Sequence, residues 1–177
     1  MKFTPTKIPG VWIVELERHA DERGWFARTW CAEEFRQHGL NPNLSQCSAS
    51  FNRRRGTLRG MHWQAAPHEE AKLVRCVRGA MFDVALDVRP GSATFKQWVG
   101  LELTPENGRS LYVPEGCAHG FQTLADDTEV FYQIVGDYHP ASGRGVRWND
   151  PAFSIAWPNV AEVVCSERDA SYPALPC

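Results

Sequence analysis

The sequence contains no apolar run that approaches the ~20 residues of a membrane-spanning helix, and residues 1–5 lack the apolar stretch of a secretion signal. It also lacks a predominant charge: the formal net charge is −2, so no broad positive field would attract nucleic acid or an anionic membrane. We therefore expect a cytoplasmic protein with no nucleic-acid or membrane partner. Any anionic ligand must then be recognised by a local group of side chains.

Paired cysteine motifs are absent as well. The six cysteines stand singly, without the spacing of a redox or zinc motif, at Cys31, Cys47, Cys76, Cys117, Cys165 and Cys177. Together with the missing signal, this favours reduced thiols that are mostly buried as small hydrophobic side chains. A catalytic role for Cys117 stays open as a minor alternative, because His119 follows it closely.

Repeats, linkers and low-complexity segments are also missing, so residues 1–177 are expected to form a single domain. Short strand-like runs separated by Gly and Pro turns recur at about ten-residue spacing, at 11–14, 46–51, 58–64, 72–78, 80–88, 95–103, 110–113, 120–124 and 129–135. One short helix is predicted over residues 32–38, followed by Gly39. This pattern predicts an all-β sandwich or barrel.

Three segments carry weaker signals. Residues 19–24 are polar and predict a turn, and two Trp/Pro clusters at 146–151 and 155–158 are expected to cover the sheet. Residues 165–170 predict a polar turn that lays a side chain over a pocket. Alternation along residues 81–89 places Asp83 and Asp87 on one face of a strand, but it does not decide whether that face lines a site or meets solvent.

A concentration of chemically active side chains lies in the strand at Leu58–Gln64 and shortly after it. Arg59, His62, Gln64 and Lys72 together supply a cation for anions, a titratable imidazole, an amide and an ammonium group. Each of them alone is compatible with an ordinary structural role. The segment 114–119, Pro-x-Gly-x-x-His, supplies His119 just before another strand and resembles the second half of the two-part cupin signature.

Two kinds of chemistry are compatible with these residues. In metal-dependent cupins, two histidines, a glutamate and a later histidine surround a divalent ion, and here His62, Glu69 and His119 stand near those spacings. Gln64 replaces the second histidine, however, and Lys72 would place a positive charge near the ion, which disfavours a metal site. A dioxygenase or isomerase of that kind remains an alternative.

The second chemistry is metal-free proton abstraction next to a carbonyl group. It needs a base, a carboxylate to orient the base, a cation for the developing enolate and an acid on the other side of the substrate. The residue types that suit these tasks are His62, His119, Lys72, Tyr132, Asp83 and Asp169.

Over nearly its full length the chain resembles the nucleotide-sugar 3,5-epimerases typified by dTDP-4-dehydrorhamnose 3,5-epimerase. The motifs that carry the resemblance are Asp21-x-Arg23-Gly24-x-Phe26, Gln46 with Ser50, residues 58–64, Lys72-Leu73-Val74, residues 83–89, Pro114-x-Gly116-x-Ala118-His119-Gly120-Phe121, Tyr132, Tyr138, Trp148-Asn149-Asp150-Pro151, Trp157-Pro158 and Ser166-x-x-Asp169. The resemblance implies a cupin-type jelly roll (double-stranded β-helix) with one or two short helices and no metal or cofactor. It also implies a homodimer with exchanged N-terminal strands.

The same resemblance implies roles for individual residues in epimerisation at C3, C5 or both of a nucleotide-diphospho-4-keto-6-deoxyhexose. His62 would be the general base paired with Asp169, Tyr132 the acid, and Lys72 the group that stabilises the enolate oxygen. The substrate-binding residues would be Asp83 and His119 near the sugar, Arg23 and Arg59 at the diphosphate, and Phe26, Gln46 and Tyr138 at the nucleoside.

The chain departs from the family pattern in the nucleoside region, where Arg28 stands in place of the usual Glu and Ser48 in place of Asn. An arginine only donates hydrogen bonds and would suit a base edge that presents acceptors. The alternatives are therefore a GDP- or CDP-linked 4-keto sugar, or a thymidine-linked one with Arg28 facing solvent or phosphate. A non-catalytic sugar-binding cupin is a third class, which the intact set of base and acid residues disfavours.

Overall fold

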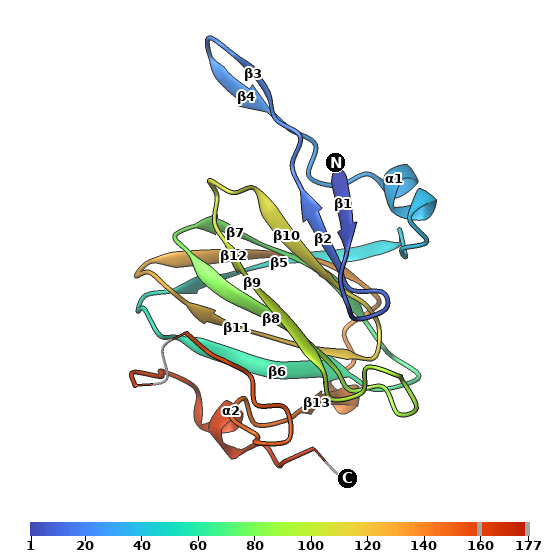
Figure 1. Ribbon diagram of the computed structural model, residues 1–177, viewed down its shortest axis with the longest axis vertical. Coiled ribbons are helices and arrows are strands. Elements are labelled where there is room, and N and C mark those ends of the chain that lie inside the picture. The colour runs from blue at the N-terminus through green and yellow to red at the C-terminus, as the bar shows by residue number, and fades with distance from the viewer. Residues whose placement is uncertain (159–160, 176–177) are drawn as a thin grey trace.

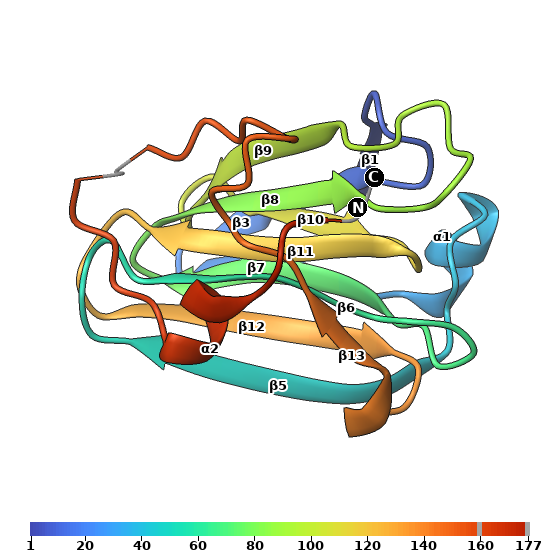
Figure 2. The same ribbon diagram turned by 90° about the horizontal axis from the view of Figure 1, so that it is seen from below.

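Two antiparallel β-sheets lie face to face in the computed structural model, which describes residues 1–158 and 161–175 (Figures 1 and 2). The first sheet has the strand order β1-β2-β10-β7-β12-β5, and the second has the order β13-β6-β11-β8-β9. A small hairpin, β3-β4, projects from the top of the sandwich. The prediction of an all-β jelly roll with one or two short helices is confirmed. Of the six cysteines, Cys177 lies outside the described residues.

The described elements follow the sequence pattern closely. Their bounds, in chain order, are β1 Lys2–Pro5, β2 Trp12–Glu15, β3 His19–Asp21, β4 Gly24–Phe26, α1 Ala32–Gln37, β5 Leu44–Asn52, β6 Leu58–Gln64, β7 Ala71–Arg78, β8 Met81–Asp87, β9 Trp98–Leu103, β10 Arg109–Val113, β11 Cys117–Thr123, β12 Thr128–Val135, a 3₁₀ turn Pro140–Ser142, β13 Gly143–Gly145 and α2 Glu167–Ser171.

Several elements differ from the expectation. The segment predicted as a polar turn forms the β3-β4 hairpin, and β1 was not predicted. The tail that we expected to be a turn contains α2, whose N-cap Ser166 accepts a hydrogen bond from the backbone N–H of Asp169. This cap explains why a polar segment becomes one turn of helix at that point.

Apolar side chains fill three layers. Between the sheets lies an interior cluster that includes Ile8, Val74 and Leu111. The outer face of the second sheet is covered by the C-terminal segment through Phe153 and Trp157, which confirms the predicted cover. The outer face of the first sheet is partly covered by α1 and the segments around it. Apolar packing therefore supports each sheet from both of its faces.

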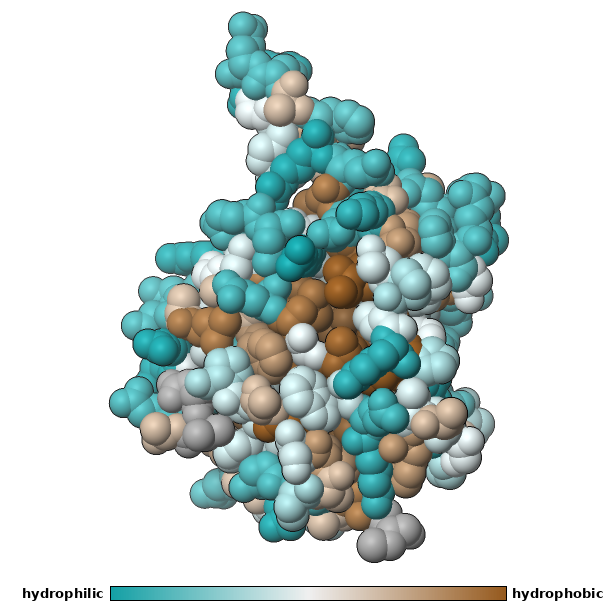
Figure 3. Space-filling model, in the orientation of Figure 1, coloured by the Kyte–Doolittle hydropathy of each residue, from teal (hydrophilic) through white to brown (hydrophobic). Residues whose placement is uncertain are grey.

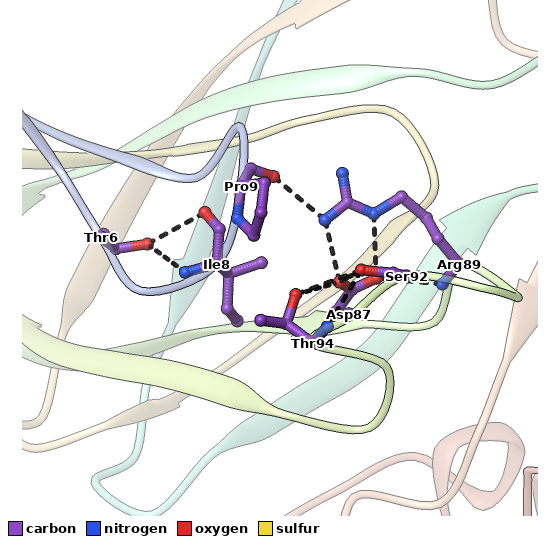
Figure 4. Close-up of polar contacts among 7 residues, drawn as sticks. All are labelled: Thr6, Ile8, Pro9, Asp87, Arg89, Ser92 and Thr94. Atoms are coloured by element: carbon purple, nitrogen blue, oxygen red, sulfur yellow. Dashed lines mark hydrogen bonds and ion pairs between the residues drawn. The ribbon is translucent and has the colours of Figure 1, made fainter.

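The alternating face of β8 that carries carboxylates points into the sandwich. The Asp87 side chain has no exposed surface and accepts hydrogen bonds from Arg89, Ser92 and Thr94 (Figure 4). Arg89 also donates to the backbone carbonyl of Pro9, so the cluster ties the N-terminal loop to the β8-β9 connection. Burial opposes ionisation of Asp87, but these bonds outweigh it and hold the pKa of the carboxyl well below its usual range.

The surface separates polar and apolar regions. Hydrophobic residues gather in the middle of the face shown in Figure 3, over the region of β2, β9 and β10, while the hairpin and the α1 end are hydrophilic. In the hairpin, however, Trp25 and Phe26 are 56% and 76% exposed. No helix among the described residues is long and apolar enough to cross a membrane.

Candidate active site

Two histidines face the space between the sheets from neighbouring strands. His62 of β6 and His119 of β11 are direct partners in the antiparallel register, so both side chains lie on the same face of the second sheet. The strands approach closely where Gly60 crosses Gly120: a Cβ at Gly60 would lie 2.5 Å from the Cα of Gly120, and its φ of +139° suits only glycine. The glycines therefore place the two imidazoles side by side.

His62 forms a dyad with a carboxylate from α2. Its Nε2 lies 2.7 Å from Oδ1 of Asp169, and the backbone N–H of Gly60 points to Oδ2 at 3.4 Å. Asp169 is 5% exposed, and burial opposes its ionisation, but the contacts with His62 lower the pKa of the carboxyl overall. The ionised carboxylate only accepts hydrogen bonds, so Nε2 carries the hydrogen and Nδ1 is left with a free lone pair.

His119 forms a second, deeper pair. Its Nε2 lies 2.7 Å from Oδ1 of Asp83, which is fully buried, and Oδ2 of Asp83 has no hydrogen-bond partner among the described residues. Burial raises the pKa of the Asp83 carboxyl, and the nearby charges of His119 and Lys72 oppose that effect only in part. The face of β8 whose orientation the sequence left open thus supports the floor of the site.

The first sheet supplies the opposite wall. Tyr132 of β12 lies edge-on to His119 with ring centroids 6.2 Å apart, and its hydroxyl lies 3.2 Å from the Ser50 hydroxyl. Burial raises the pKa of Tyr132 to about 12, so the phenol keeps its proton at neutral pH. On the neighbouring strand β7, Lys72 forms an ion pair at 2.8 Å with Glu70, and both side chains are largely buried.

These groups surround a pocket of about 470 Å³ between the sheets, close to the edge strands β5 and β13. The helix α2 lies against β6 (Figure 2). The lining residues are Ser48, Ser50, Arg59, His62, Trp63, Gln64, Glu70, Lys72, His119, Phe121, Tyr132, Ile134, Tyr138, Pro140, Gly143, Arg144, Ser166, Arg168, Asp169 and Tyr172. A base backed by a carboxylate on one wall and a neutral phenol on the other can remove and return protons on opposite sides of a bound molecule.

Most of the predicted site residues meet in this pocket. Arg59 lies there with its Nε donating to Asn52 at 2.8 Å, and Ser48 and Tyr138 also line it. Asp83 lies behind His119, and Gln46 lies outside the lining, with its amide 3.5 Å from the carbonyl of Gly136.

The predicted residues of the N-terminal region do not meet this pocket within their own chain. Arg23 forms an ion pair with Asp21 on the hairpin, next to the exposed Phe26. Arg28 forms an ion pair at 3.2 Å with Glu34 of α1. Within its own chain, the guanidinium of Arg28 is therefore paired with Glu34 at the surface, outside the lining of the pocket.

The alternative metal site is not assembled. Glu69 is exposed and does not line the pocket, while the Gln64 amide is held by the carbonyls of His68 and Asp137. The described residues contain no group of three or more His, Cys, Asp or Glu side chains that could hold an ion. The donor set therefore does not fit the metal-dependent interpretation.

Cys117 does not belong to the site either. It is 3% exposed, lies at the start of β11 in register with Asp87, and does not line the pocket. Burial raises the pKa of its thiol to about 12, so the reactive thiolate is disfavoured.

Four polar pocket residues were not predicted from the sequence: Glu70, Arg144, Arg168 and Tyr172. Glu70 was detectable, because it stands two positions before Lys72 and thus shares its face of an extended strand. The other three come from the C-terminal segment, where no periodic pattern shows which side chains return to the sheets.

Comparisons with known proteins agree over nearly the whole chain. The family model described as dTDP-4-dehydrorhamnose 3,5-epimerase matches residues 5–176. A curated protein of that name from Sinorhizobium fredii is 43% identical over 99% of this chain and 90% of its own length. The crystal structure of dTDP-4-dehydrorhamnose 3,5-epimerase from Elizabethkingia anophelis is 38% identical, with a TM-score of 0.95 over 98% of this chain and 96% of that one. A Legionella pneumophila dTDP-6-deoxy-D-glucose-3,5-epimerase in complex with dTDP-4-keto-L-rhamnose is 36% identical, with a TM-score of 0.92 over 98% and 92%.

Proposed function

Because the chain belongs to the dTDP-4-dehydrorhamnose 3,5-epimerase family, we propose that it is an isomerase that inverts C3 and C5, or one of these centres, of a dTDP-linked 4-keto-6-deoxyhexose. The observation that carries the proposal is the His62–Asp169 dyad on one sheet with the neutral phenol of Tyr132 on the other. Epimerisation requires these two positions, since a proton must leave one face of a carbon and return on the opposite face.

The geometry supports the following reaction. The free lone pair on Nδ1 of His62 takes the proton from the carbon next to the C4 ketone, and the electrons of the C–H bond move to the ketone oxygen as an enolate. The ammonium of Lys72 stabilises that oxygen, because a charged donor in a site that excludes water interacts more strongly with developing negative charge than water does. Tyr132 returns a proton to the opposite face and becomes a phenolate. Solvent then resets both groups: the protonated imidazole of His62 releases its proton to water, and the phenolate of Tyr132 takes one up.

The cationic residues of the lining suit the diphosphate. Arg59, Arg144 and Arg168 all line the pocket, and guanidinium forks match pairs of phosphate oxygens. Tyr138 is 65% exposed at the rim, where a flat ring can stack on a nucleobase. The substrate would thus lie with its sugar between the sheets and its nucleoside at the rim.

The chain is also proposed to act as a homodimer in the cytoplasm. The β3-β4 hairpin carries exposed Trp25 and Phe26 away from its own sandwich, together with Arg23 (Figure 1). Exchange of this hairpin would bring a phosphate-binding cation and an aromatic ring to the partner's pocket. The five described cysteines are free, which suits a reducing compartment.

Proton NMR in D₂O with dTDP-4-keto-6-deoxyglucose tests the function. We expect deuterium at C3 and C5 of the sugar with protein stripped of metal, and the ratio of the two positions reports whether one centre or both are processed. His62→Ala should abolish the exchange. Wild-type protein that exchanges neither position would overturn the proposal, and a dependence on added metal would restore the metal-dependent alternative.

A further inference from the structure

Tyr172 covers one side of the His62 imidazole. It is the residue at the C-terminal end of α2, it lines the pocket, and its ring stands edge-on to that of His62 with centroids 5.6 Å apart and an interplanar angle of 62°. The ring rests on β13 at Gly145, where an added Cβ would lie 2.4 Å from Cζ of the tyrosine. Only a glycine at that position leaves room for the ring.

The Tyr172 hydroxyl has a partner of its own. Nε of Arg168 donates to it at 2.7 Å, and the guanidinium lies 5.6 Å from the ring centroid of the same tyrosine. Arg168 also lines the pocket. The bond occupies Nε and leaves the two terminal amino groups of the guanidinium for an anionic ligand, in an orientation that a freely rotating arginine would hold only part of the time.

We propose that Tyr172 is a positioning residue for both parts of the substrate, an inference that depends on the proposed function. Its ring restricts the orientation of His62 and shields that side of the base from water, while its hydroxyl holds Arg168 toward the diphosphate. The two tasks belong to different atoms of one side chain, so they can be separated by mutation.

Tyr172→Phe removes the hydroxyl and retains the ring. We expect KM for the nucleotide sugar to rise about tenfold, which corresponds to the loss of one hydrogen bond to a charged group, while kcat stays within about twofold of wild type. The rate of deuterium incorporation at saturating substrate should likewise remain unchanged. A residue that only stabilised the fold would reduce the active fraction and hence kcat, with KM unaffected.

Tyr172→Ala removes the ring as well. Its kcat should fall by about ten- to a hundredfold in addition to the rise in KM, because a base that loses its lateral contact leaves the productive orientation. Gly145→Ala supplies the complementary perturbation: its Cβ displaces the ring and should lower kcat to a similar extent. Introduced into the Tyr172→Ala background, Gly145→Ala should cause no further loss, because the ring with which it collides is gone.

Ser171→Ala is the matched control. It removes a side-chain bond within α2, from Ser171 to the carbonyl of Arg168, without altering the pocket lining, so its kinetic constants should equal those of wild type. Thermal unfolding of each variant identifies loss of folded protein. The inference is overturned if wild type turns over while Tyr172→Phe leaves KM unchanged, or if Gly145→Ala and Tyr172→Ala reduce kcat additively. Absence of turnover by wild type would instead overturn the proposed function.

Discussion

Replacing Asp169 with asparagine exchanges one carboxylate oxygen for an amino group and should remove most of the activity. The new side chain would keep its carbonyl oxygen at the Oδ2 site, since the backbone N–H of Gly60 points there, and would turn its amino group toward Nε2 of His62. A donor facing Nε2 forces the imidazole hydrogen onto Nδ1, which is the atom proposed to accept the substrate proton. The opposite orientation would place two donors against each other at Gly60.

The size of the loss follows from the role of the base. A positioned general base contributes about 10²- to 10⁴-fold, so kcat should fall by that factor, equivalent to about 3 to 5 kcal/mol of barrier. The assay is deuterium incorporation at C3 and C5, followed by NMR under saturating substrate. Glu167→Gln is the matched control, since it removes an exposed carboxylate from the same helix. Activity of Asp169→Asn within about tenfold of wild type, with unchanged thermal stability, would refute the assignment of the dyad.

Three further substitutions test other parts of the structure. Tyr132→Phe removes the hydroxyl that contacts Ser50. Deuterium should still enter the first carbon, while the rate at which the inverted product forms falls at least about a hundredfold. An equal fall of both rates in the NMR assay would contradict the role of Tyr132 as the acid. Asp87→Ala should lower the free energy of unfolding at pH 7 by about 3 to 5 kcal/mol in urea titrations. The pKa of Asp87 is lower in the folded chain than in the unfolded one, so this contribution is present above about pH 4 and is lost at more acidic pH. A difference in unfolding free energy between the variant and wild type that is undiminished at about pH 3 would contradict this account. Gly60→Ala should yield little folded protein, because its Cβ would lie 2.5 Å from Gly120, and a variant that purifies with the thermal stability of wild type would contradict that packing.

The sequence predicted the strands best where β-rich runs are packed inside the sandwich. β6 was predicted with its observed bounds, and all its residues except Arg59 are buried or half-buried. The hairpin was predicted as a turn because all six of its strand residues are exposed, so its sequence shows no alternation of apolar and polar residues. α2 is only five residues long and is specified by its cap and by contacts of Asp169 that are distant in the chain.

The residues of the site likewise differ in how far the sequence predicted them. His62, His119, Lys72 and Tyr132 were predicted from their chemical types and from the motifs of the family resemblance, and the strand register places His62 beside His119 and Lys72 on the same face as Tyr132. The position of the glutamate could not be settled by spacing: Glu69 stood near the metal-cupin distance, but the face shared with Lys72 brings Glu70 into the pocket instead.

A sandwich of two sheets is well suited to inversion at carbon, and the reason lies in its two walls. A single sheet can place many groups on one side of a substrate, but epimerisation needs a proton acceptor and a proton donor on opposite sides. Here the second sheet carries His62, and the first sheet carries Tyr132. Each group is tuned by its own surroundings: an ionised carboxylate fixes the imidazole, and burial keeps the phenol neutral. The stereochemical outcome would therefore depend on the spacing of the sheets, which the packed apolar side chains between them maintain. Substitutions in that interior should alter the ratio of deuterium exchange at C3 and C5, measured by proton NMR, before they abolish the exchange.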